Sequence, residues 1–397
     1  MMRRYYLLLW AFLWVFLPAT LQAQDQVLLP DSVQSLVQRL LGEKNKDLKT
    51  NMNLEFYTSG AASFNDWELD EANFKVNRVR LEIRGSVLQN FSYHFRQSFN
   101  KYSTPHTVDN LSHSIEYACV KWQMDPKVSL TVGKQLFRLG GYEYWVNGIK
   151  VRQFSEFNNA VTSHQAGVGL GYTPNENHTL NLQVLNNRVG SYEDEYIYGK
   201  PQDVESTKIP LMAVLNWNGY FADKKLFLCY GVASGEQAKK RGSLYLTAGH
   251  VYQNGPVTAY LDVMYARLGL DSHGVLSELQ TNRLNPQTLQ HTEYLSLIAD
   301  VDYRIADHWN LYVKGAYETA GIYKRGEADD LPTGAYKRSW NAQFCVEYYP
   351  VKSQELLFFA HLLYKGYNLT EKGKALGANL KDSQRVSLGL VYIIPVI

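Results

Sequence analysis

The stretch "RVRLEIRGSVLQNFSYHFRQSFN", residues 78–100, alternates apolar and polar side chains over most of its length. Its first half places Val79, Leu81 and Ile83 on one face of an extended chain and charged residues on the other. After a short break at 88–90, the second half repeats this alternation with aromatic residues. Because side chains on a strand point to opposite faces with a period of two, the stretch predicts a β-hairpin with one apolar and one charged face.

The first 23 residues have the features of an export signal. Arg3 and Arg4 precede a continuous apolar run over 5–17, and a short cleavage-site sequence follows. This order of segments predicts a secretory signal peptide over residues 1–23. Residues 24–50 then predict a short periplasmic amphipathic helix followed by a polar linker.

The overall charge of the chain is balanced. It holds 40 basic and 38 acidic residues, and removing the two arginines of the signal leaves 38 of each. A balanced chain gives no reason to expect nucleic-acid binding or long-range electrostatic steering. Cys119, Cys229 and Cys345 are odd in number and far apart, so they predict packing residues rather than a disulfide framework.

From residue 51 to the end the sequence predicts β-structure throughout. After the signal, no apolar run approaches the ~18–20 residues of a membrane-spanning helix, and no linker divides the strands. One domain over residues 51–397 is therefore expected. The sixteen predicted strands are 51–59, 74–86, 90–100, 112–123, 127–138, 165–173, 178–188, 209–218, 225–234, 243–253, 257–268, 290–305, 308–319, 339–349, 354–365 and 384–395.

The lengths of the connections alternate along the chain. Connections after even-numbered strands are short, and those after odd-numbered strands are long. This pattern predicts an all-β, 16-stranded antiparallel transmembrane β-barrel with short periplasmic turns and long extracellular loops. A soluble exported sandwich is the alternative, but it gives no reason for the loops to sort in this way. The predicted long loops are 60–73, 101–111, 139–164, 189–208, 235–242, 269–289, 320–338 and 366–383.

The third long loop is the longest connection, and it suggests a constriction. A barrel of about sixteen strands leaves an aqueous lumen, which must be narrowed before it can select solutes. The loop at 139–164 contains glycines for tight bends together with aromatic and charged residues. We predict that it folds into the lumen; an outward surface loop is the alternative. Its candidate constriction residues are Tyr142, Glu143, Lys150, Arg152 and Glu156.

The segments "NFSYHFRQSF" and "SIEYACVKWQMDPKVSLTVGKQLF" resemble the phosphate-selective porin O and P family. The first matches a strand of the Phe-Ser-Tyr-x-Phe type. The second contains an Ala-x-Val-x-aromatic strand that ends at Trp122, followed by Val-Gly-Lys at 132–134. The match is clearest over residues 75–140, and the predicted strand number agrees with the sixteen-stranded barrel of the family.

The resemblance implies passive, water-filled diffusion biased towards anions such as phosphate. In that family a ladder of arginines leads the anion to a lysine-rich constriction, and the channel is often a homotrimer in outer-membrane lipid. Repeated guanidinium groups along a lumen would offer an anion several weak sites in series. The candidate pore-lining and anion-binding residues are Arg78, Arg80, Arg84, Arg96, Lys134 and Arg138.

The chain also departs from the family pattern. The Lys-x-Pro-Phe sequence that many members show is replaced by Leu136-Phe137-Arg138, and the loop at 139–164 lacks a dense lysine cluster. Phosphate selectivity and a general porin therefore both remain open. Acids also fall on the predicted polar faces: Glu82, Asp262, Asp300, Asp302 and Glu347.

No sequence motif supports catalysis or a cofactor. HExxH, CxxC and Walker-type motifs are absent from the sequence, and its ten histidines are scattered. We therefore predict a bacterial outer-membrane porin rather than an enzyme, with no cofactor and no metal. The alternative from a different class is a surface adhesion or binding barrel whose lumen is plugged.

Overall fold

The computed structural model describes residues 50–88, 90–101, 108–196, 198–326 and 331–396 of the 397-residue chain. The predicted signal peptide and the predicted N-terminal helix lie outside these ranges. Within them, no helix is both long enough and apolar enough to cross a membrane.

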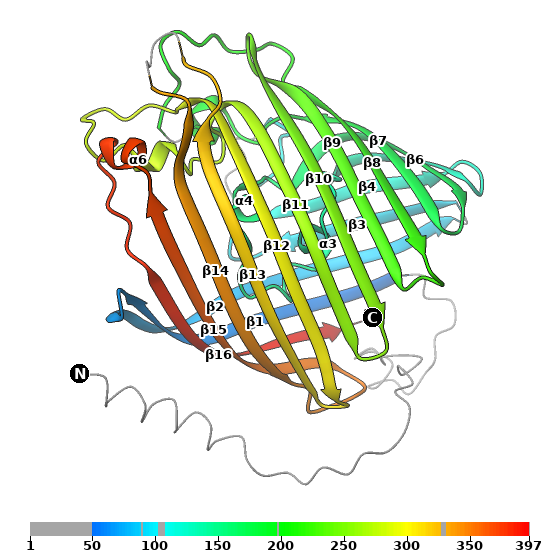
Figure 1. Cartoon of the computed structure of the whole chain (residues 1–397). Helices are drawn as coiled ribbons and strands as arrows, with labels where there is room; N and C mark the ends of the chain where they lie inside the picture. The colour runs from blue at the N-terminus through cyan, green and yellow to red at the C-terminus, as the bar shows by residue number, and fades with distance from the viewer. Residues whose placement is uncertain (1–49, 89, 102–107, 197, 327–330, 397) are drawn as a thin grey trace, which may run out of the picture. The chain divides into compact units, whose positions relative to one another are not determined.

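Sixteen antiparallel strands form a closed barrel (Figure 1). Each strand pairs with its neighbours in sequence, and β1 closes the barrel by pairing with β16. The number and order of the strands confirm the predicted fold. The strands are β1 (Thr50–Asn65), β2 (Glu68–Leu88), β3 (Phe91–Ser98), β4 (Ile115–Gln123), β5 (Val128–Leu136), β6 (His164–Asn175), β7 (His178–Asn186), β8 (Leu211–Phe221), β9 (Leu226–Ala238), β10 (Arg241–Asn254), β11 (Val257–Leu270), β12 (Gln290–Ala306), β13 (Trp309–Ile322), β14 (Gly334–Tyr348), β15 (Glu355–Leu369) and β16 (Ser383–Pro395).

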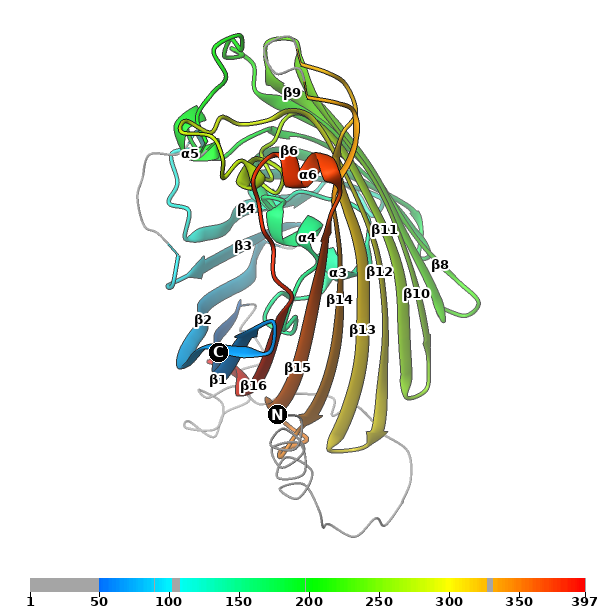
Figure 2. The same cartoon turned by 60° about the vertical axis from the view of Figure 1, so that its left-hand side comes forward.

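The helical segments of the described residues are short and lie in the long connections. Figures 1 and 2 show α5 and α6 at the long-loop rim, and α3 and α4 between the two rims. The loop that carries α3 and α4 joins β5 to β6 over residues 137–163 and is called loop L3 below. The segments are α3 (Tyr142–Trp145), α4 (Glu156–Ala160), α5 (Tyr192–Glu195), the 3-10 turn η2 (Ser277–Leu279) and α6 (Glu371–Ala375).

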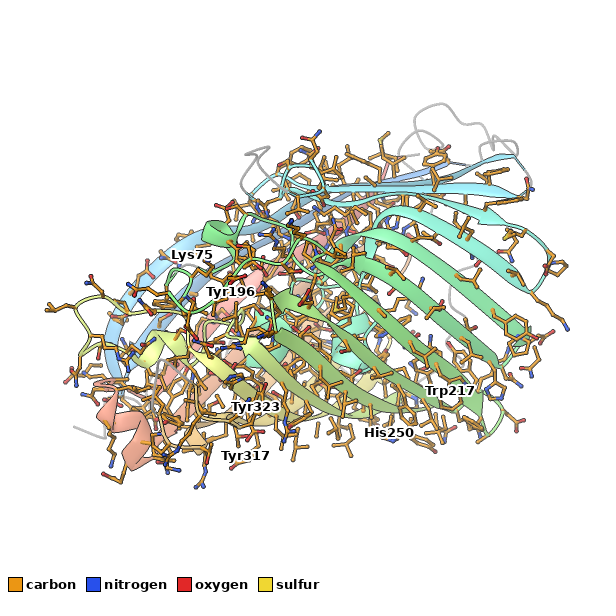
Figure 3. All side chains as sticks on the ribbon, turned by 90° about the horizontal axis from the view of Figure 1, so that it is seen from above. Lys75, Tyr196, Trp217, His250, Tyr317 and Tyr323 are labelled. Atoms are coloured by element: carbon orange, nitrogen blue, oxygen red, sulfur yellow. The ribbon has the colours of Figure 1, made fainter. Side chains whose placement is uncertain are left out.

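The two faces of the strands differ as predicted. On β12, Leu297 and Val301 are exposed, whereas Ser296 and Asp300 on the other face are buried. Figure 3 shows side chains on both faces of the barrel wall, and Tyr317 on β13, 43% exposed, lies on the outer face. The outward face is therefore apolar, and the polar residues of the strands point into the lumen, which is the reverse of a soluble sandwich.

Two of the predicted long loops are wrong. β1 and β2 continue to a two-residue turn at Asp66 and Trp67, so most of 60–73 is strand. β9 and β10 likewise continue to a two-residue turn, so most of 235–242 is strand. Asp66 and Trp67 have φ of 50° and 69°, as a tight hairpin turn requires. The prediction failed because polar residues dominate both hairpin ends, while the backbone ladder does not depend on apolar alternation.

The height of the barrel wall is uneven. β3, β4 and β5 contain only 8, 9 and 9 residues, whereas β12, on the opposite wall, contains 17. The three cysteines are free and sit in strands, as their spacing predicted. The short strands β3–β5 and the long strands β10–β15, called the long wall below, therefore lie in two different walls, and loop L3 lies between them.

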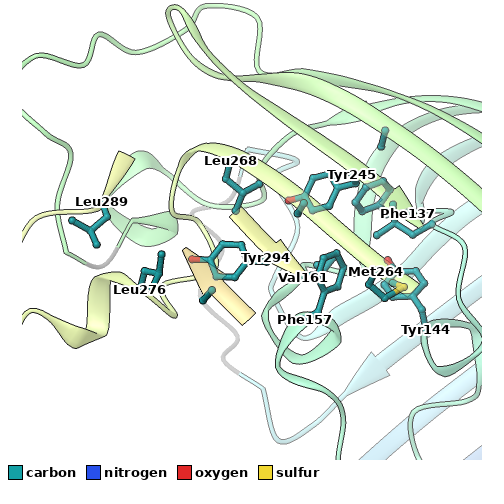
Figure 4. Close-up of a cluster of buried hydrophobic side chains, with 14 of the residues drawn as sticks. Phe137, Tyr144, Phe157, Val161, Tyr245, Met264, Leu268, Leu276, Leu289 and Tyr294 are labelled. Atoms are coloured by element: carbon teal, nitrogen blue, oxygen red, sulfur yellow. The ribbon is translucent and has the colours of Figure 1, made fainter. Parts of the chain in front are cut away.

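An apolar cluster, called the inner cluster below, packs inward-facing residues of β8–β14 against the long loops. Figure 4 shows Phe157 and Val161 of loop L3 beside Met264 of β11, and Leu276 of the β11–β12 loop beside Tyr294 of β12. All five side chains are nearly inaccessible to solvent. Burial of this many apolar groups holds the loops against the inner wall of the barrel.

Candidate functional site

The wall formed by β1–β5, called the short wall below because β3, β4 and β5 are short, borders a cavity of about 770 Å³, called the basic cavity below. Its lining runs from Lys101 and His113, beside the long-loop ends of β3 and β4, to Arg84 near the short-turn end of β2. Trp145 and Asn147 of loop L3 form part of its other side. The cationic side chains that line it are Arg78, Arg80, Arg84, Arg96, Lys101 and Lys134.

Strand register brings carboxylates to the arginines of this wall. Glu55 on β1 stands directly opposite Arg80 on β2, and Glu82 on β2 stands opposite Arg96 on β3. Nε of Arg80 donates to Oε2 of Glu55 at 2.6 Å, and Arg80 is only 1% exposed. Opposite charges in facing positions on one sheet face stabilise the pairing, and burial strengthens the interaction between them.

Glu116 on β4 shares its carboxylate among several cations. Its Oε2 lies 2.7 Å from Nε of Arg96 and 3.5 Å from Nη1 of Arg80, and its Oε1 lies 2.8 Å from Nζ of Lys101. Ser98 Oγ also donates to Glu116, at 2.9 Å. The guanidinium groups of Arg80 and Arg96 are therefore held in fixed positions by an internal ion-pair network.

The remaining pairs involve Arg84 and Lys134. Arg84 lies 2.8 Å from Glu82, and Lys134 lies 2.9 Å from Asp109. Five of the six cations of the basic cavity are thus paired with four carboxylates, which leaves these cations and their partners in the described residues with an excess of two positive charges.

Arg78 is the sixth cation and differs from the others. No hydrogen bond or ion pair joins its guanidinium group to any residue that the structure describes. A Cβ atom added to Gly148 would lie 2.9 Å from its Nη1, so the group lies against loop L3 at the edge of the cavity. Arg78 therefore has hydrogen-bond donors available to a ligand in the cavity.

Loop L3 is anchored by inward-facing carboxylates of the long wall. Asp262 on β11 accepts the backbone N–H groups of Tyr142 and Glu143, each at 2.8 Å. Glu318 on β13 accepts the N–H groups of the first two residues of α4, at 2.8 and 3.1 Å. The first N–H groups of a helix have no partner within it, so these carboxylates satisfy donors that the loop alone leaves unpaired.

Glu143 joins the two halves of loop L3 to the long wall. Its buried carboxylate accepts from the backbone N–H of Ser155 at 3.1 Å and from its hydroxyl at 2.6 Å, and it also bonds Asn158. Lys314 on β13 completes the cluster with an ion pair to Glu143. A buried charge with so many partners fixes the loop strongly, because losing any one of them leaves the charge undercompensated.

Arg152 makes a second anchor of loop L3. Its Nη2 lies 3.0 Å from Oε1 of Glu347 on β14, and its guanidinium carbon lies 4.4 Å from the ring centroid of Phe359 on β15. The ion pair and the ring contact both bury the guanidinium group, which is 6% exposed as a residue. Arg152 therefore holds the loop in place instead of offering a free cation.

A second cavity, of about 240 Å³, lies near the short-turn ends of β11–β14 and is called the acidic cavity below. Val146 of loop L3 lines both cavities, so the loop separates them. The carboxylates that line the acidic cavity are Glu143, Asp300, Asp302 and Glu347, and its tyrosines are Tyr142, Tyr260, Tyr312 and Tyr349.

A model of phosphate-selective porin O and P proteins matches residues 48–394. The chain belongs to the phosphate-selective porin O and P family. It is therefore a channel protein of the bacterial outer membrane, and the sequence-based recognition of the family is confirmed. No curated protein sequence matches the chain.

Solved structures similar to this porin have the same fold. The outer-membrane channel DcaP of Acinetobacter baumannii matches with a TM-score of 0.59 and 10% identity, over 87% of this chain and 96% of that one. The anion-selective porin of Comamonas acidovorans matches with a TM-score of 0.54 and 10% identity, over 87% and 99%. OmpF of Salmonella typhi gives 0.54 and 10%, over 86% and 97%. At such low identities the likeness concerns the fold alone.

Five of the six predicted pore-lining residues of the porin border the basic cavity, and Arg138 is the exception. The backbone N–H of Arg138 donates to Gln183 at 2.9 Å, and its guanidinium carbon lies 5.5 Å from the ring centroid of Trp145. It lines neither cavity. Among the predicted residues of the loop, Glu156 pairs with Lys337 at 2.9 Å outside both cavities. The four that line the acidic cavity are Tyr142, Glu143, Lys150 and Arg152.

Sequence reasoning missed the carboxylate partners of the porin's arginines. Glu55 and Glu116 follow the alternation of their strands, and strand pairing would have placed Glu55 opposite Arg80. Sequence reasoning also missed Lys314, which anchors loop L3, because its partner Glu143 lies 171 residues away in a loop. No local signal in the sequence joins these two residues.

Burial shifts the pKa of two titratable groups in the long loops away from their usual values. Burial raises the pKa of Glu195, at the end of α5, to about 7. Burial lowers the pKa of His273, in the β11–β12 loop, to about 3. Both nitrogens of the His273 ring lack a hydrogen-bond partner in the described residues. His273 is therefore neutral at physiological pH and adds no positive charge at the long-loop rim.

Proposed function

We propose that this porin lets small hydrophilic anions, phosphate among them, diffuse passively across the outer membrane through the basic cavity. The observation that carries the proposal is the excess of two positive charges along a cavity whose lining extends from the long-loop ends of β3 and β4 to Arg84 near the short-turn end of β2. A lumen of one charge sign concentrates solutes of the other.

Arg78 is the residue that we expect to contact the anion directly. Its guanidinium group has no partner among the described residues, whereas Arg80 and Arg96 are already bonded to carboxylates. Paired guanidinium groups still add to the local field, but fewer of their donors remain for a solute. With one unpaired guanidinium group among paired ones, an anion can bind strongly enough to enter the channel and weakly enough to leave it, as passage requires.

Loop L3 is the proposed constriction of the route. Gly148 faces Arg78, and Trp145 and Asn147 line the same cavity. The anchors at Asp262 and Glu318 hold the loop against the long wall, so its position does not depend on the solute. A loop fixed in this way narrows the lumen by a constant amount.

Planar-bilayer recording of the purified porin tests the proposal. In a salt gradient the reversal potential should report a preference for the anion, and Arg78→Ala should reduce the anion/cation permeability ratio. Lys352→Ala, in the β14–β15 turn and exposed, is the matched control and should leave the ratio unchanged. A cation preference in the wild-type porin would overturn the anion route but keep the channel. An unchanged ratio in Arg78→Ala would place Arg78 outside the route.

A barrel with a plugged lumen that binds partners at the surface is the second candidate. The inner cluster favours it, because apolar groups of loop L3 and the β11–β12 loop fill part of the lumen. The two candidates differ in one measurement. If the purified protein inserts into the bilayer and gives no conductance, the plugged barrel is the better description.

We also propose that the porin assembles as a homotrimer through its short wall. A strand of eight residues rises about 26 Å along its own axis, and the usual tilt reduces its span to about 20 Å. This is less than the ~25 Å apolar band of an outer-membrane barrel, so a neighbouring copy would cover β3–β5 better than lipid. Lipid would contact the outward apolar face elsewhere. A monomeric mass in light scattering of the detergent-solubilised porin would contradict the trimer.

Export by a cleaved signal over residues 1–23, followed by a periplasmic segment over 24–50, remains a proposal as well. The basic start and apolar run of the sequence support it. Mass spectrometry of the protein purified from outer membranes should give a mature chain that begins after residue 23. A mass that includes the apolar run 5–17 would contradict cleavage.

A further inference from the structure

The acidic cavity has a charge opposite to that of the basic cavity. Its cations Lys314 and Arg152 are both used to pair carboxylates, Glu143 and Glu347 respectively. Lys150 is half exposed and pairs with Glu355, which does not line the cavity. Asp300 and Asp302 therefore leave this side of loop L3 with two carboxylates that no cation of the described residues pairs.

Asp300 is the decisive residue of this cavity. It is 9% exposed, lines the cavity, and has no hydrogen bond or ion pair among the described residues. Lys314 stands opposite it in the β12–β13 ladder, but the ammonium group of Lys314 bonds Glu143 and donates to the carbonyl of Gln153 at 2.9 Å. A carboxylate buried without a partner is unfavourable, so a bound cation would satisfy it.

Asp302 adds a second carboxylate on the same face of β12. It accepts one bond, from Nδ2 of Asn310 at 3.2 Å, which leaves one of its oxygens open. Because side chains at i and i+2 of a strand share a face, Asp300 and Asp302 both point into the cavity. Two adjacent acceptors suit a group that donates several hydrogen bonds from a single atom.

Aromatic rings surround these acceptors. Tyr260 stands opposite Asp300 in the β11–β12 ladder, and Tyr312 stands opposite Asp302 in the β12–β13 ladder. The rings of Tyr260 and Tyr142 lie 5.1 Å apart between centroids, so part of the cavity wall is apolar as well as rich in π-electrons. Such a wall attracts an organic cation through its ring faces and accepts the apolar body that the cation carries.

From this arrangement we propose that the acidic cavity binds the primary ammonium group of a small organic solute. The ammonium donates to Asp300 and Asp302, and its carbon chain packs against the tyrosines. A metal ion is the poorer fit, because no three His, Cys, Asp or Glu side chains converge at a point in the described residues. The site lies apart from Arg78 across loop L3 and does not depend on the anion route.

Isothermal titration calorimetry of the detergent-solubilised porin tests the site with three probes of one shape. Butylammonium chloride should bind saturably, whereas butanol and sodium butyrate should not. Equal heats from butanol would show that the cavity recognises only the apolar chain and would overturn the assignment. Complete displacement of butylammonium by an equal concentration of calcium chloride would identify a metal site and would overturn it too.

The variant Asp300→Asn/Asp302→Asn locates the binding. We expect its affinity for butylammonium to fall by about tenfold or more, because charge-assisted hydrogen bonds to the carboxylates are lost. Asp307→Asn is the matched control, since Asp307 lies in the β12–β13 turn and pairs with Lys352 outside the cavity. Unchanged affinity in the double variant would refute the site. If the double variant does not fold, the three-probe comparison on the wild-type porin still decides.

Discussion

The short wall and the long wall of this barrel both carry buried charges, but they use them differently. Around the basic cavity of the short wall, cations outnumber their carboxylate partners, and all but Arg78 are paired, within β2, between neighbouring strands or with the β3–β4 connection. On the long wall, Asp262 and Glu318 bond loop L3, whereas Asp300 has no partner. One wall is therefore stabilised from within, and the other is stabilised partly by a loop that lies against it.

The difference shows that an arginine-rich lumen is not by itself an anion site. Arg80 is more deeply buried than Arg78, yet its donors already serve Glu55, Glu116 and Asn147. A paired guanidinium group contributes mainly to the stability and shape of the wall. An unpaired one on the same face has donors that are free for a solute, as the proposed anion route requires.

The largest effect that we expect is on stability, from Arg80→Ala. Removing this guanidinium leaves Glu55 buried without its partner, which should lower the free energy of unfolding by about 3–5 kcal/mol. Urea titration followed by tryptophan fluorescence measures the change. Lys352→Ala removes an exposed pair and should cost less than about 1 kcal/mol. If the two variants lose equal stability, the short wall is not held by its internal pairs.

A smaller but still large effect should follow from Glu143→Ala. The change frees Ser155 and Asn158 and breaks the ion pair with Lys314, so loop L3 loses its central anchor. We expect a loss of about 2–3 kcal/mol, below that of Arg80→Ala, because Lys314 can turn to Asp300 opposite it.

The same variant tests the role of loop L3 in conduction. A loop released from Glu143 should narrow the lumen less, so the single-channel conductance in planar bilayers should rise. Ser339→Ala, which removes one hydrogen bond to Glu156 at the far end of the loop, is the milder comparison. Conductance equal to that of the wild type, in a variant with the expected loss of stability, would show that loop L3 does not limit the current.

The sequence predicted the walls better than the charges on them. Sixteen strands could be counted because lipid on one side and water on the other impose alternation, as Leu297 and Asp300 illustrate on β12. The alternation fails at 60–73, where strand continues although its side chains no longer separate into an apolar and a polar face. The backbone hydrogen bonds that pair β1 with β2 in this region produce no recognisable pattern in the amino-acid sequence.

Which charged side chains pair with one another could largely not be predicted from the sequence. That Arg78 and Arg80 share a face follows from their spacing, but that only Arg80 has partners follows from the register of β1 and β4. The bonds of loop L3 are less predictable still. Glu143 of loop L3 and Lys314 of β13 come together only when the barrel is closed. A long loop can reach many inward-facing residues, so the sequence does not tell which one it bonds.

A third prediction separates the two walls by the sign of the effect. Asp300→Asn removes a buried charge that has no partner, so the free energy of unfolding should rise by up to about 1 kcal/mol. The same urea titration measures it. Glu55→Gln, on the short wall, makes the same chemical change to a paired carboxylate and should instead destabilise the porin. Destabilisation by both variants would mean that Asp300 is paired as well.

We expect the smallest effect on stability from Gly148→Ala. This variant tests whether anion preference depends on the position of the Arg78 guanidinium group or only on its charge. The new methyl group would lie 2.9 Å from Nη1 of Arg78, so the guanidinium must move, but the end of a long side chain can do so easily. Stability should change by no more than about 0.5 kcal/mol. Gly315→Ala on β13, where the nearest atom would be 3.7 Å away, is the matched control.

The reversal potential of Gly148→Ala then divides two explanations of selectivity. If Arg78 acts as a binding site, moving its donors should lower the anion/cation permeability ratio slightly, and by less than Arg78→Ala does. If the short wall acts only through its net charge, the ratio should equal that of the wild type, because no charge has been removed. The second result would mean that the anion preference comes from the net charge of the whole paired network and not from the unpaired guanidinium of Arg78. Arg78 and Arg80 would then differ only in their contribution to stability.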